Sequence, residues 1–332
     1  MEKALIFSDL HVHNYKNFNE NGRRLKNGIA FLDYIFKLAN ANQIKLILMP
    51  GDLFDKMQIM ATKAVNAVAA CFQMNFEQYP DIALIAVSGN HDDAEKNLLD
   101  NPSESALDYL DYVFPNFILL DHYPHTFHTA GGTTIRGVRY FEHSEHFRAA
   151  LNEAGIEQNK KNTILMMHQI VGSGLPIEDD IEPIDPLFDP FTLVLNGHIH
   201  NCEQLTDKFI NVGSPMHRDA WDIGKQKGFW IVDLDDPIET IAFKDISDKY
   251  PQFIHKTQGE ALTEWESQQY VIWVPDPIAD SVKDQKLAEK FSTSLAPTEI
   301  LKNYCETVLP ENELKDKLAY GLTLLLERQK MY

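Results

Sequence analysis

Residues 45–55 read Lys-Leu-Ile-Leu-Met-Pro-Gly-Asp-Leu-Phe-Asp, an apolar run that ends abruptly in glycine and acid. A short apolar run bounded by a turn residue predicts a buried strand. Four further runs, which begin at Ala4, Ile82, Thr163 and Leu193, also end in polar residues. Apolar residues at helical spacing lie between the first three runs, at 29–39 and 65–72. This alternation predicts an α/β fold with helices covering a sheet.

Metal-binding side chains follow all five predicted strands. In chain order they are Asp9 and His11, then Asp52 and Asp55, then Asn90 and His91, then His168, then His198 and His200. In an open α/β architecture, the loops beyond the carboxyl ends of the strands converge on one crevice. Oxygen and nitrogen donors without sulfur suit manganese, iron or zinc rather than a thiolate-bound structural zinc. The sequence therefore predicts a polar metal crevice at these strand ends.

Each residue also has a structural explanation when taken alone. A lone strand-terminal histidine such as His168 is more often structural than a ligand, and Gly51 and Gly89 are ordinary turn residues. Such explanations do not account for five strands that all end in metal-binding residue types. His13 is expected to face solvent or to pack. Five further histidines are interpreted as surface residues because no spacing among them matches a ligand pattern: His122, His125, His128, His143 and His146.

The charge and the cysteine content of the chain exclude several classes of function. The chain has 332 residues and a formal charge of -19, so diffuse attraction to nucleic acid is excluded. Three distant cysteines indicate neither a disulfide framework nor a thiolate metal site. The start is not that of a signal peptide, and no apolar stretch approaches the length of a membrane span. The expected location is the cytoplasm, or the host cytoplasm for a phage-encoded protein.

Regular α/β alternation ends after Pro237. Before that point, runs at 117–120, 133–138, 209–212 and 229–234 predict more strands, and the last two suggest a second sheet after the final motif. Beyond it, 250–254 and 270–275 predict a small strand-rich module. Two apolar stripes, at 300–309 and 314–326, flank Pro310 and predict a helical hairpin, which either packs on its own domain or faces a partner.

The five polar blocks together resemble the calcineurin-like metallophosphoesterases. This resemblance implies a two-sheet sandwich flanked by helices and a centre with two divalent metal ions, expected to be Mn²⁺. Asp9, His11, Asp52 and His200 would bind the first ion, and Asp52, Asn90, His168 and His198 the second, with Asp52 bridging. His91 would stabilise developing charge or protonate the leaving oxygen, and Asp55 would orient the His91 ring.

Within that family, the sequence is most similar to DNA repair nuclease subunits of the SbcD type, and above all to phage recombination nuclease subunits. Lys56 and Met57 stand where protein phosphatases carry Arg-Gly, and the stretches 211–219 and 225–230 resemble the nucleases. The resemblance implies a catalytic domain at 1–245, a capping module at 246–280 and a helical segment at 281–332 that docks on an SMC-like coiled-coil ATPase. Asp55 replaces a histidine that some repair nucleases carry and that is tied to their exonuclease activity. The ratio of exonuclease to endonuclease activity in those nucleases is therefore not expected to hold for this chain.

The expected function is a manganese-dependent DNA nuclease that acts in a recombination or double-strand-break repair complex. A phosphodiesterase or phosphatase for small nucleotides is the alternative enzyme, and a partner-bridging scaffold is the alternative of another class. The acidic surface implies that the ATPase supplies much of the DNA-binding charge. A basic cluster either touches a phosphate backbone or is a solvated helix start: Lys16, Arg23, Arg24 and Lys26. Residues 61–72 with Leu107, Leu110 and Val113 either form a homodimer contact or pack in the core.

Overall fold

The structure is a computed structural model, and it describes residues 2–15, 17–55, 61–93, 105–121, 126–155, 162–171 and 186–274. The chain divides into two compact units. The first comprises residues 1–254 and 264–270, and the second comprises residues 255–263 and 271–332. The candidate site and both large sheets lie in the first unit.

The first sheet has six described strands in the order β12-β11-β1-β2-β3-β4. Their bounds are β1 (Lys3–Ile6), β2 (Leu46–Pro50), β3 (Ala83–Val87), β4 (Phe117–Leu119), β11 (Gly228–Asp233) and β12 (Ala242–Asp245). Strands β1 to β4 are parallel, so their carboxyl ends meet at one edge. Strand β11 runs antiparallel to β1, and β12 runs antiparallel to β11.

The second sheet also has six described strands, in the order β5-β6-β7-β8-β10-β9. Their bounds are β5 (Thr126–His128), β6 (Thr134–Val138), β7 (Thr163–His168), β8 (Leu193–Gly197), β9 (Glu203–Thr206) and β10 (Phe209–Asn211). Strands β6, β7, β8 and β10 are parallel, and the outer strands β5 and β9 are antiparallel to their neighbours.

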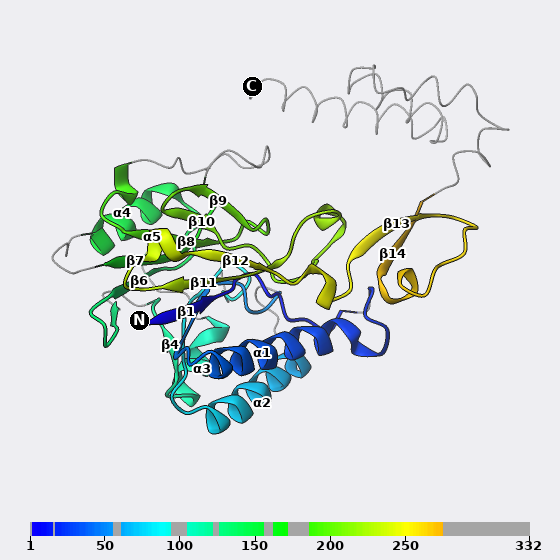
Figure 1. Cartoon of the computed structure of the whole chain (residues 1–332), viewed down its shortest axis with the longest axis horizontal. Coiled ribbons are helices and arrows are strands. Elements are labelled where there is room, and N and C mark those ends of the chain that lie inside the picture. Colours follow the sequence, from blue (N-terminus) through cyan, green and yellow to red (C-terminus); the bar gives the residue numbers. More distant parts are fainter. Residues whose placement is uncertain are drawn as a thin grey trace, which may run out of the picture. The chain divides into compact units, whose positions relative to one another are not determined.

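Helices cover the outer faces of the two sheets (Figure 1). Helices α1 (Arg23–Ala41), α2 (Thr62–Gln78) and α3 (Ala106–Val113) pack on the first sheet, and α4 (Ser144–Gly155) packs on the second. The short helix α5 (Pro237–Thr240) joins β11 to β12. Single 3-10 turns lie at Glu20–Gly22, Pro186–Phe188, Ala220–Asp222, Ser247–Lys249 and Glu266–Gln268. No helix of the described residues is long and apolar enough to cross a membrane.

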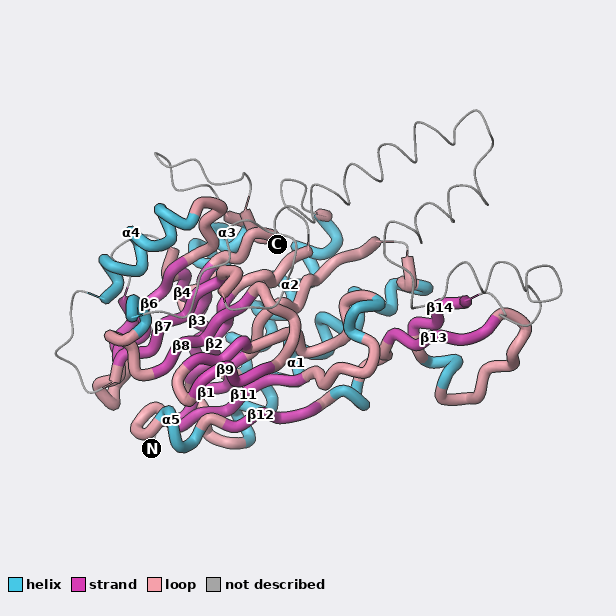
Figure 2. The backbone as a smooth tube through the Cα atoms, turned by 90° about the horizontal axis from the view of Figure 1, so that it is seen from above, coloured by secondary structure: helices cyan, strands magenta, loops and turns pink. Residues whose placement is uncertain are grey.

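The period-two alternation of the strands builds the central core. Leu5 and Phe7 pack with the helices, whereas Ala4 and Ile6 face the inner core with residues of the second sheet such as Ile164. Both faces of each sheet are therefore covered, which explains why strands such as β2 are apolar throughout. Seen from above, the strands of the two sheets overlie one another (Figure 2). This layering confirms the predicted two-sheet α/β sandwich.

Two of the predicted strands sit elsewhere than expected. The run at 209–212 and the run at 229–234 do form β10 and β11, but they do not build a sheet together. Strand β10 joins β8 in the second sheet, and β11 joins β1 in the first. The reason is that β11 completes the open side of β1, with four residue pairs from Lys3↔Asp233 to Ile6↔Trp230, and such long-range pairing has no local signal.

The region after residue 246 bears on other predictions. Strands β13 (Phe253–Thr257) and β14 (Tyr270–Val274) pair as a two-stranded sheet where a small strand-rich module was predicted. The predicted helical hairpin between residues 300 and 326 lies outside the described residues. Of the residues considered for a homodimer contact, Leu107 and Leu110 are fully buried within the chain, so core packing accounts for these two residues.

Candidate metal centre

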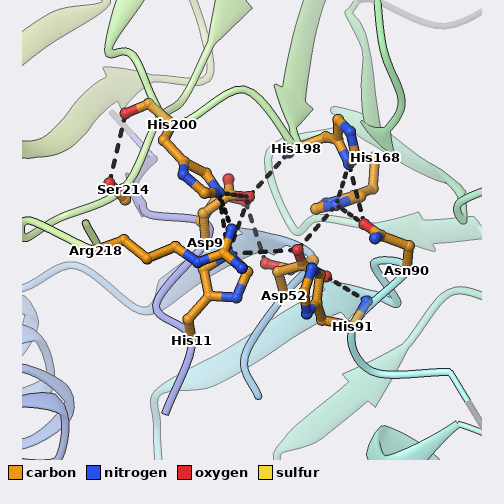
Figure 3. A network of polar contacts seen from close by, with 12 residues as sticks. Asp9, His11, Asp52, Asn90, His91, His168, His198, His200, Ser214 and Arg218 are labelled. Atoms are coloured by element: carbon orange, nitrogen blue, oxygen red, sulfur yellow. Dashed lines mark hydrogen bonds and ion pairs between the residues drawn. The ribbon is translucent and has the colours of Figure 1, made fainter. Parts of the chain in front are cut away.

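The five predicted strand ends converge on one place. Strands β1, β2 and β3 of the first sheet and β7 and β8 of the second are parallel neighbours in their sheets, so their following loops meet. Figure 3 shows the result, with Asp52 at the centre, His11 and His200 on one side, and Asn90, His168 and His198 on the other. Residues separated by up to 191 positions, from Asp9 to His200, thus form one cluster.

The Asp52 carboxylate belongs to both sides of the cluster. Its Oδ1 accepts a hydrogen bond of 2.9 Å from the backbone N–H of His91. This bond leaves Oδ2 facing the other histidines, 3.5 Å from His11 Nε2 and 3.4 Å from His168 Nε2. One carboxylate oxygen therefore lies between two separate groups of donor atoms.

The first group surrounds Asp9 and His11. His11 Nε2 and His200 Nε2 lie 3.1 Å apart, and Asp9 Oδ1 lies 3.9 Å from the first and 3.8 Å from the second. Asp9 Oδ1 also accepts a hydrogen bond of 3.0 Å from the backbone N–H of His198, which ties the β1 loop to the β8 loop. Asp9, His11, His200 and Asp52 form the set that the family resemblance assigns to the first ion.

The second group surrounds Asn90. Its Oδ1 lies 3.0 Å from His198 Nδ1 and 3.2 Å from His168 Nε2, and these two nitrogens are 3.3 Å apart. His168 Nδ1 lies 2.8 Å from the carbonyl oxygen of Pro50, which holds the proton on Nδ1, so Nε2 is the nitrogen that faces Asn90 and Asp52. Asn90, His168 and His198, together with Asp52, form the set that the family resemblance assigns to the second ion.

The backbone at these positions is strained. Asp9, His11, Asp52 and His198 all have positive φ values, of 52°, 49°, 54° and 75°. This region is unfavourable for residues with a side chain and is found where the surrounding structure over-determines it, often at functional sites. Gly89 meets a different constraint, because a Cβ there would collide with the Asp52 carboxylate and the Asp52 backbone. The loops therefore hold the donor atoms in place by close backbone packing.

Burial sets the ionisation of the cluster. It raises the pKa of Asp9 to about 7. Burial also acts to raise the pKa of Asp52, but His168 and His11 hold that pKa well below its usual range. His168 is the converse case, because Asp52 overcomes burial and raises its pKa to about 9. Burial lowers the pKa of His198 and of His200 to about 3. Neutral imidazoles are the form that binds metals, so His198 and His200 are in the binding form, whereas a metal ion would have to displace a proton from His168.

The residues present fit divalent cations. Asp9 Oδ2 is buried and has no hydrogen-bond partner among the described residues, which is costly for a carboxylate oxygen unless a cation lies beside it. Three sets of ligand atoms lie mutually within 4.8 Å: Asp9 with His11 and His200, His11 with Asp52 and His91, and Asp9 with Asp52 and His168. Carboxylate oxygens and imidazole nitrogens suit Mn²⁺, Fe²⁺ or Zn²⁺.

Residues 3–202 match the family model described as calcineurin-like phosphoesterase. The matched span contains all five strands that carry the cluster and ends two residues beyond His200. The chain belongs to the calcineurin-like phosphoesterase family. Membership makes it a metal-dependent hydrolase, and the donor groups around Asp52 are consistent with that chemistry.

Known relatives of this phosphoesterase include a nuclease component. The chain is 27% identical over 240 residues to the SbcD component of the nuclease SbcCD from Staphylococcus saprophyticus, a match that covers 64% of this chain. It spans 62% of that relative's length. A solved structure aligns with a TM-score of 0.42 and 13% identity over 74% of this chain and 99% of the other, a similarity too low to add to the family assignment.

Asp55 contacts His91 in another way than expected. His91 Nδ1 lies 2.9 Å from the main-chain carbonyl oxygen of Asp55, not from its carboxylate. The carboxylate instead lies 3.1 Å from His11 Nδ1 and 3.3 Å from Arg218 Nη2. The expectation that the carboxylate orients His91 is therefore corrected: the Arg218 cation attracts the carboxylate, and the carbonyl takes its place at His91.

Arg218 and Asp92 are site residues of the phosphoesterase that sequence reasoning did not assign. Arg218 Nη1 lies 3.2 Å from His200 Nε2, so the guanidinium bridges His200 and Asp55. The buried Asp92 accepts hydrogen bonds from the backbone N–H groups of Leu53, Phe54 and Gly89, which ties the β2 loop to the β3 loop. Asp92 stands next to His91 in the third polar block, and that position was the available signal. Arg218 had none.

The basic cluster of the first loop is largely tied to the chain itself. Arg23 lies over the Tyr270 ring at 4.6 Å and donates to the carbonyl oxygen of Gln268 at 3.1 Å. Arg24 donates to the carbonyl oxygen of Arg218 at 2.6 Å. Lys26 is exposed, and Lys16 lies outside the described residues. Arg23 and Arg24 thus connect α1 to later segments.

Three of the histidines that the sequence placed outside the metal site lie as expected. His13 is buried against Tyr15, and His128 and His143 are exposed.

A buried lysine supports the loop that carries His200. Lys227 is 0% exposed, and its ammonium uses all three donors: 2.8 Å to the carbonyl oxygen of His200, 2.8 Å to Ser214 Oγ and 2.6 Å to Asp222 Oδ1. The same cation helps to hold the pKa of the Asp222 carboxyl below its usual value although burial acts to raise it. Lys227 therefore holds the backbone at His200 in place through the hydrogen bond to its carbonyl oxygen.

We expect Lys227→Met to destabilise the fold strongly, because it leaves the Asp222 carboxylate buried without its cation. Breaking a buried pair from one side costs about 3–5 kcal/mol. Urea unfolding of the two proteins measures the difference. Lys244→Met on β12 is the matched control, since Lys244 is exposed and its loss should change the free energy of unfolding by less than about 0.5 kcal/mol. Equal unfolding midpoints for the two variants would contradict this account.

Proposed function

We propose that this phosphoesterase is a two-metal DNA nuclease, and that it hydrolyses phosphodiester bonds as the catalytic subunit of a recombination or double-strand-break repair complex. The observation that carries the proposal is the position of Asp52 Oδ2, which faces both groups of donor atoms. The proposed ligands are Asp9, His11, Asp52 and His200 for one ion, and Asp52, Asn90, His168 and His198 for the other. Mn²⁺ is the proposed ion.

When bound, two divalent cations lower the pKa of water and neutralise charge on the attacking and leaving oxygens of a phosphate. The protein's part is to hold the ligand atoms rigidly through the strained loops and their hydrogen bonds. The Oδ1 bond to the His91 N–H orients the Asp52 carboxylate, and the Pro50 carbonyl fixes the tautomer of His168. The Arg218 guanidinium adds positive charge beside His200, where a phosphate oxygen would need it.

His91 is the proposed general acid. Its Nδ1 faces the Asp55 carbonyl oxygen, which accepts but cannot donate, so Nδ1 keeps its proton in either charge state. Nε2 is then the nitrogen that gains and loses a proton. His91 is partly exposed and lines the same cavity as Asp52, His198 and His200, so this nitrogen has access to a bound substrate. The geometry suits protonation of the oxygen that leaves.

The choice of DNA rests on sequence likeness. The relative SbcD is a component of a nuclease, and the stretch 211–219 resembles that class. A chain with a formal charge of -19 needs a cationic partner for tight DNA binding, since phosphate neutralisation supplies most of nonspecific affinity. We propose that an SMC-like ATPase is that partner and that residues 281–332, outside the described residues, bind it.

A substrate panel tests the proposal. Purified protein with Mn²⁺ is offered labelled duplex DNA, single-stranded DNA, a cyclic nucleotide and an aryl phosphodiester, with and without the ATPase. We expect DNA cleavage that EDTA abolishes and that the ATPase enhances. A truncation ending at residue 299 should still hydrolyse the aryl diester but no longer respond to the ATPase. Turnover of the cyclic nucleotide without DNA cleavage, even with the ATPase present, would refute the nuclease assignment.

A further inference from the structure

Trp221 presents an unusual surface beside the metal centre. Its side chain is 83% exposed, although a tryptophan normally contributes to stability by burying its large apolar ring. It lies on the 3-10 turn Ala220–Asp222. The turn borders a cavity of about 270 Å³ that is also lined by Asp52, His91, His198 and His200. An exposed indole therefore stands at the mouth of the proposed catalytic site.

The backbone beneath the indole is anchored. The Asp219 side chain accepts a hydrogen bond of 2.8 Å from the Trp221 N–H in a capping box with Asp222. Asp222 is buried, accepts from the Arg218 N–H at 2.7 Å and pairs with Lys227. Lys227 in turn holds the His200 carbonyl. The position of the Trp221 backbone is thus coupled to the loop that carries a proposed metal ligand, and its exposure does not come from an unanchored loop.

The charges around the indole favour an anionic ligand. Three acids line the cavity, and each has a partner within the protein: Asp52 with the site histidines, Asp219 with the Trp221 N–H, and Asp222 with Lys227. The basic side chains of the lining are Arg218, whose Nη2 lies 3.3 Å from the Asp55 carboxylate, and Lys225, which is exposed. A flat apolar ring suits the base of a nucleotide. The two basic side chains and the phosphoester-hydrolysing centre suit its phosphates.

We propose that Trp221 is a stacking platform for an unpaired base of the DNA strand that is cut, with Arg218 and Lys225 beside the flanking phosphates. This inference rests on the proposed nuclease function and adds a preference for frayed or single-stranded ends. Stacking accepts every base, because each base has a π face, so the preference is for strand state and not for sequence. A base in a duplex is already stacked and paired, and it reaches the indole only after melting.

The test compares Trp221→Ala, Trp221→Phe and the control Tyr112→Ala. Tyr112 lies on α3, is 90% exposed and does not line the cavity. The measured quantity is kcat/KM on a single-stranded oligonucleotide divided by kcat/KM on an aryl phosphodiester, which normalises for the metal centre. We expect Trp221→Ala to lower this ratio by about 5- to 150-fold, the equivalent of one stacked base. Phenylalanine should restore most of the loss, and the tyrosine control should match the wild type.

An abasic scan separates stacking from a structural effect. Oligonucleotides with one base removed at successive positions are cleaved by the wild type and by Trp221→Ala. One abasic position should slow the wild type as much as the alanine substitution does, and combining the two should add nothing. Independent losses at every position, or an alanine variant equal to Tyr112→Ala, would overturn the stacking proposal. A wild type that hydrolyses the aryl diester but no DNA would instead refute the nuclease function.

Discussion

Asp52→Asn is expected to reduce turnover to near background and to remove bound metal. The substitution keeps the size of the side chain, and one of its atoms must still accept the hydrogen bond from the His91 N–H. The amide oxygen takes that place, so the NH₂ group points toward His11 and His168, where Oδ2 now lies. An amide NH₂ cannot bind a cation, and the donor shared by both groups is lost.

The effect should exceed that of losing a single stabilising group. Removing one electrostatic donor from an active site costs about 10²–10³ in rate, so a ligand common to two ions should cost about 10³ or more. Elemental analysis after gel filtration should find the metal content lowered from two ions per chain to one or none. Hydrolysis of an aryl phosphodiester in saturating Mn²⁺ reports the rate.

Asp81→Asn is the matched control. It makes the same chemical change on the surface, where the Asp81 side chain is 77% exposed and lies 3.1 Å from Lys45. Exposed ion pairs contribute roughly 0–1 kcal/mol, so metal content and turnover should stay as in the wild type. An Asp52→Asn protein that holds two ions and turns over at a tenth of the normal rate or faster would refute the bridging role.

His91→Ala should separate catalysis from metal binding. His91 Nδ1 is engaged by the Asp55 carbonyl, and the proposed ligand sets are complete without this ring. Both ions should therefore remain, while DNA cleavage falls by about 10²–10⁴, the usual contribution of a general acid. The backbone N–H that orients Asp52 is unaffected by the substitution.

The leaving group makes the test sharper. A DNA alkoxide needs a proton as it departs, whereas a nitrophenolate departs without one. We therefore expect His91→Ala to lose much more activity on DNA than on a nitrophenyl phosphodiester. His143→Ala, an exposed histidine on the loop before α4, should behave as the wild type. Equal losses on the two substrates would show that His91 stabilises charge without donating a proton, and loss of metal would make it a ligand.

Much of the site was predictable because its ligands follow local rules. An apolar run that stops at Asp, Asn or His marks a strand end, and parallel strands bring their carboxyl ends together. The loops at Asp52 and Asn90 could therefore be assigned to one crevice without knowing the order of the strands. The α/β fold class followed from the same alternation of strand and helix patterns, whereas the two-sheet arrangement was implied by the family resemblance.

Other features depended on contacts between distant segments. The pairing of β11 with β1 joins residues about 225 positions apart, and the sequence of neither strand indicates which strand it pairs with. The Asp55 carboxylate turned away from His91 because Arg218, 163 residues later, lies beside it. The support of His200 by Lys227 and the exposure of Trp221 at the cavity arise in the same way.

The sequence by itself thus determined the fold class and the residue types that meet at the strand ends, because hydrophobic period and strand termination are encoded within a few residues. Only the tertiary structure decided which atom of each side chain faces which neighbour: that Asp52 presents Oδ2 to both groups, and that a carbonyl and not a carboxylate holds His91. The physical reason is that the orientation of each side chain depends on the burial and the charges around it. Those surroundings are supplied by several loops that only folding brings together, so no local stretch of sequence contains them.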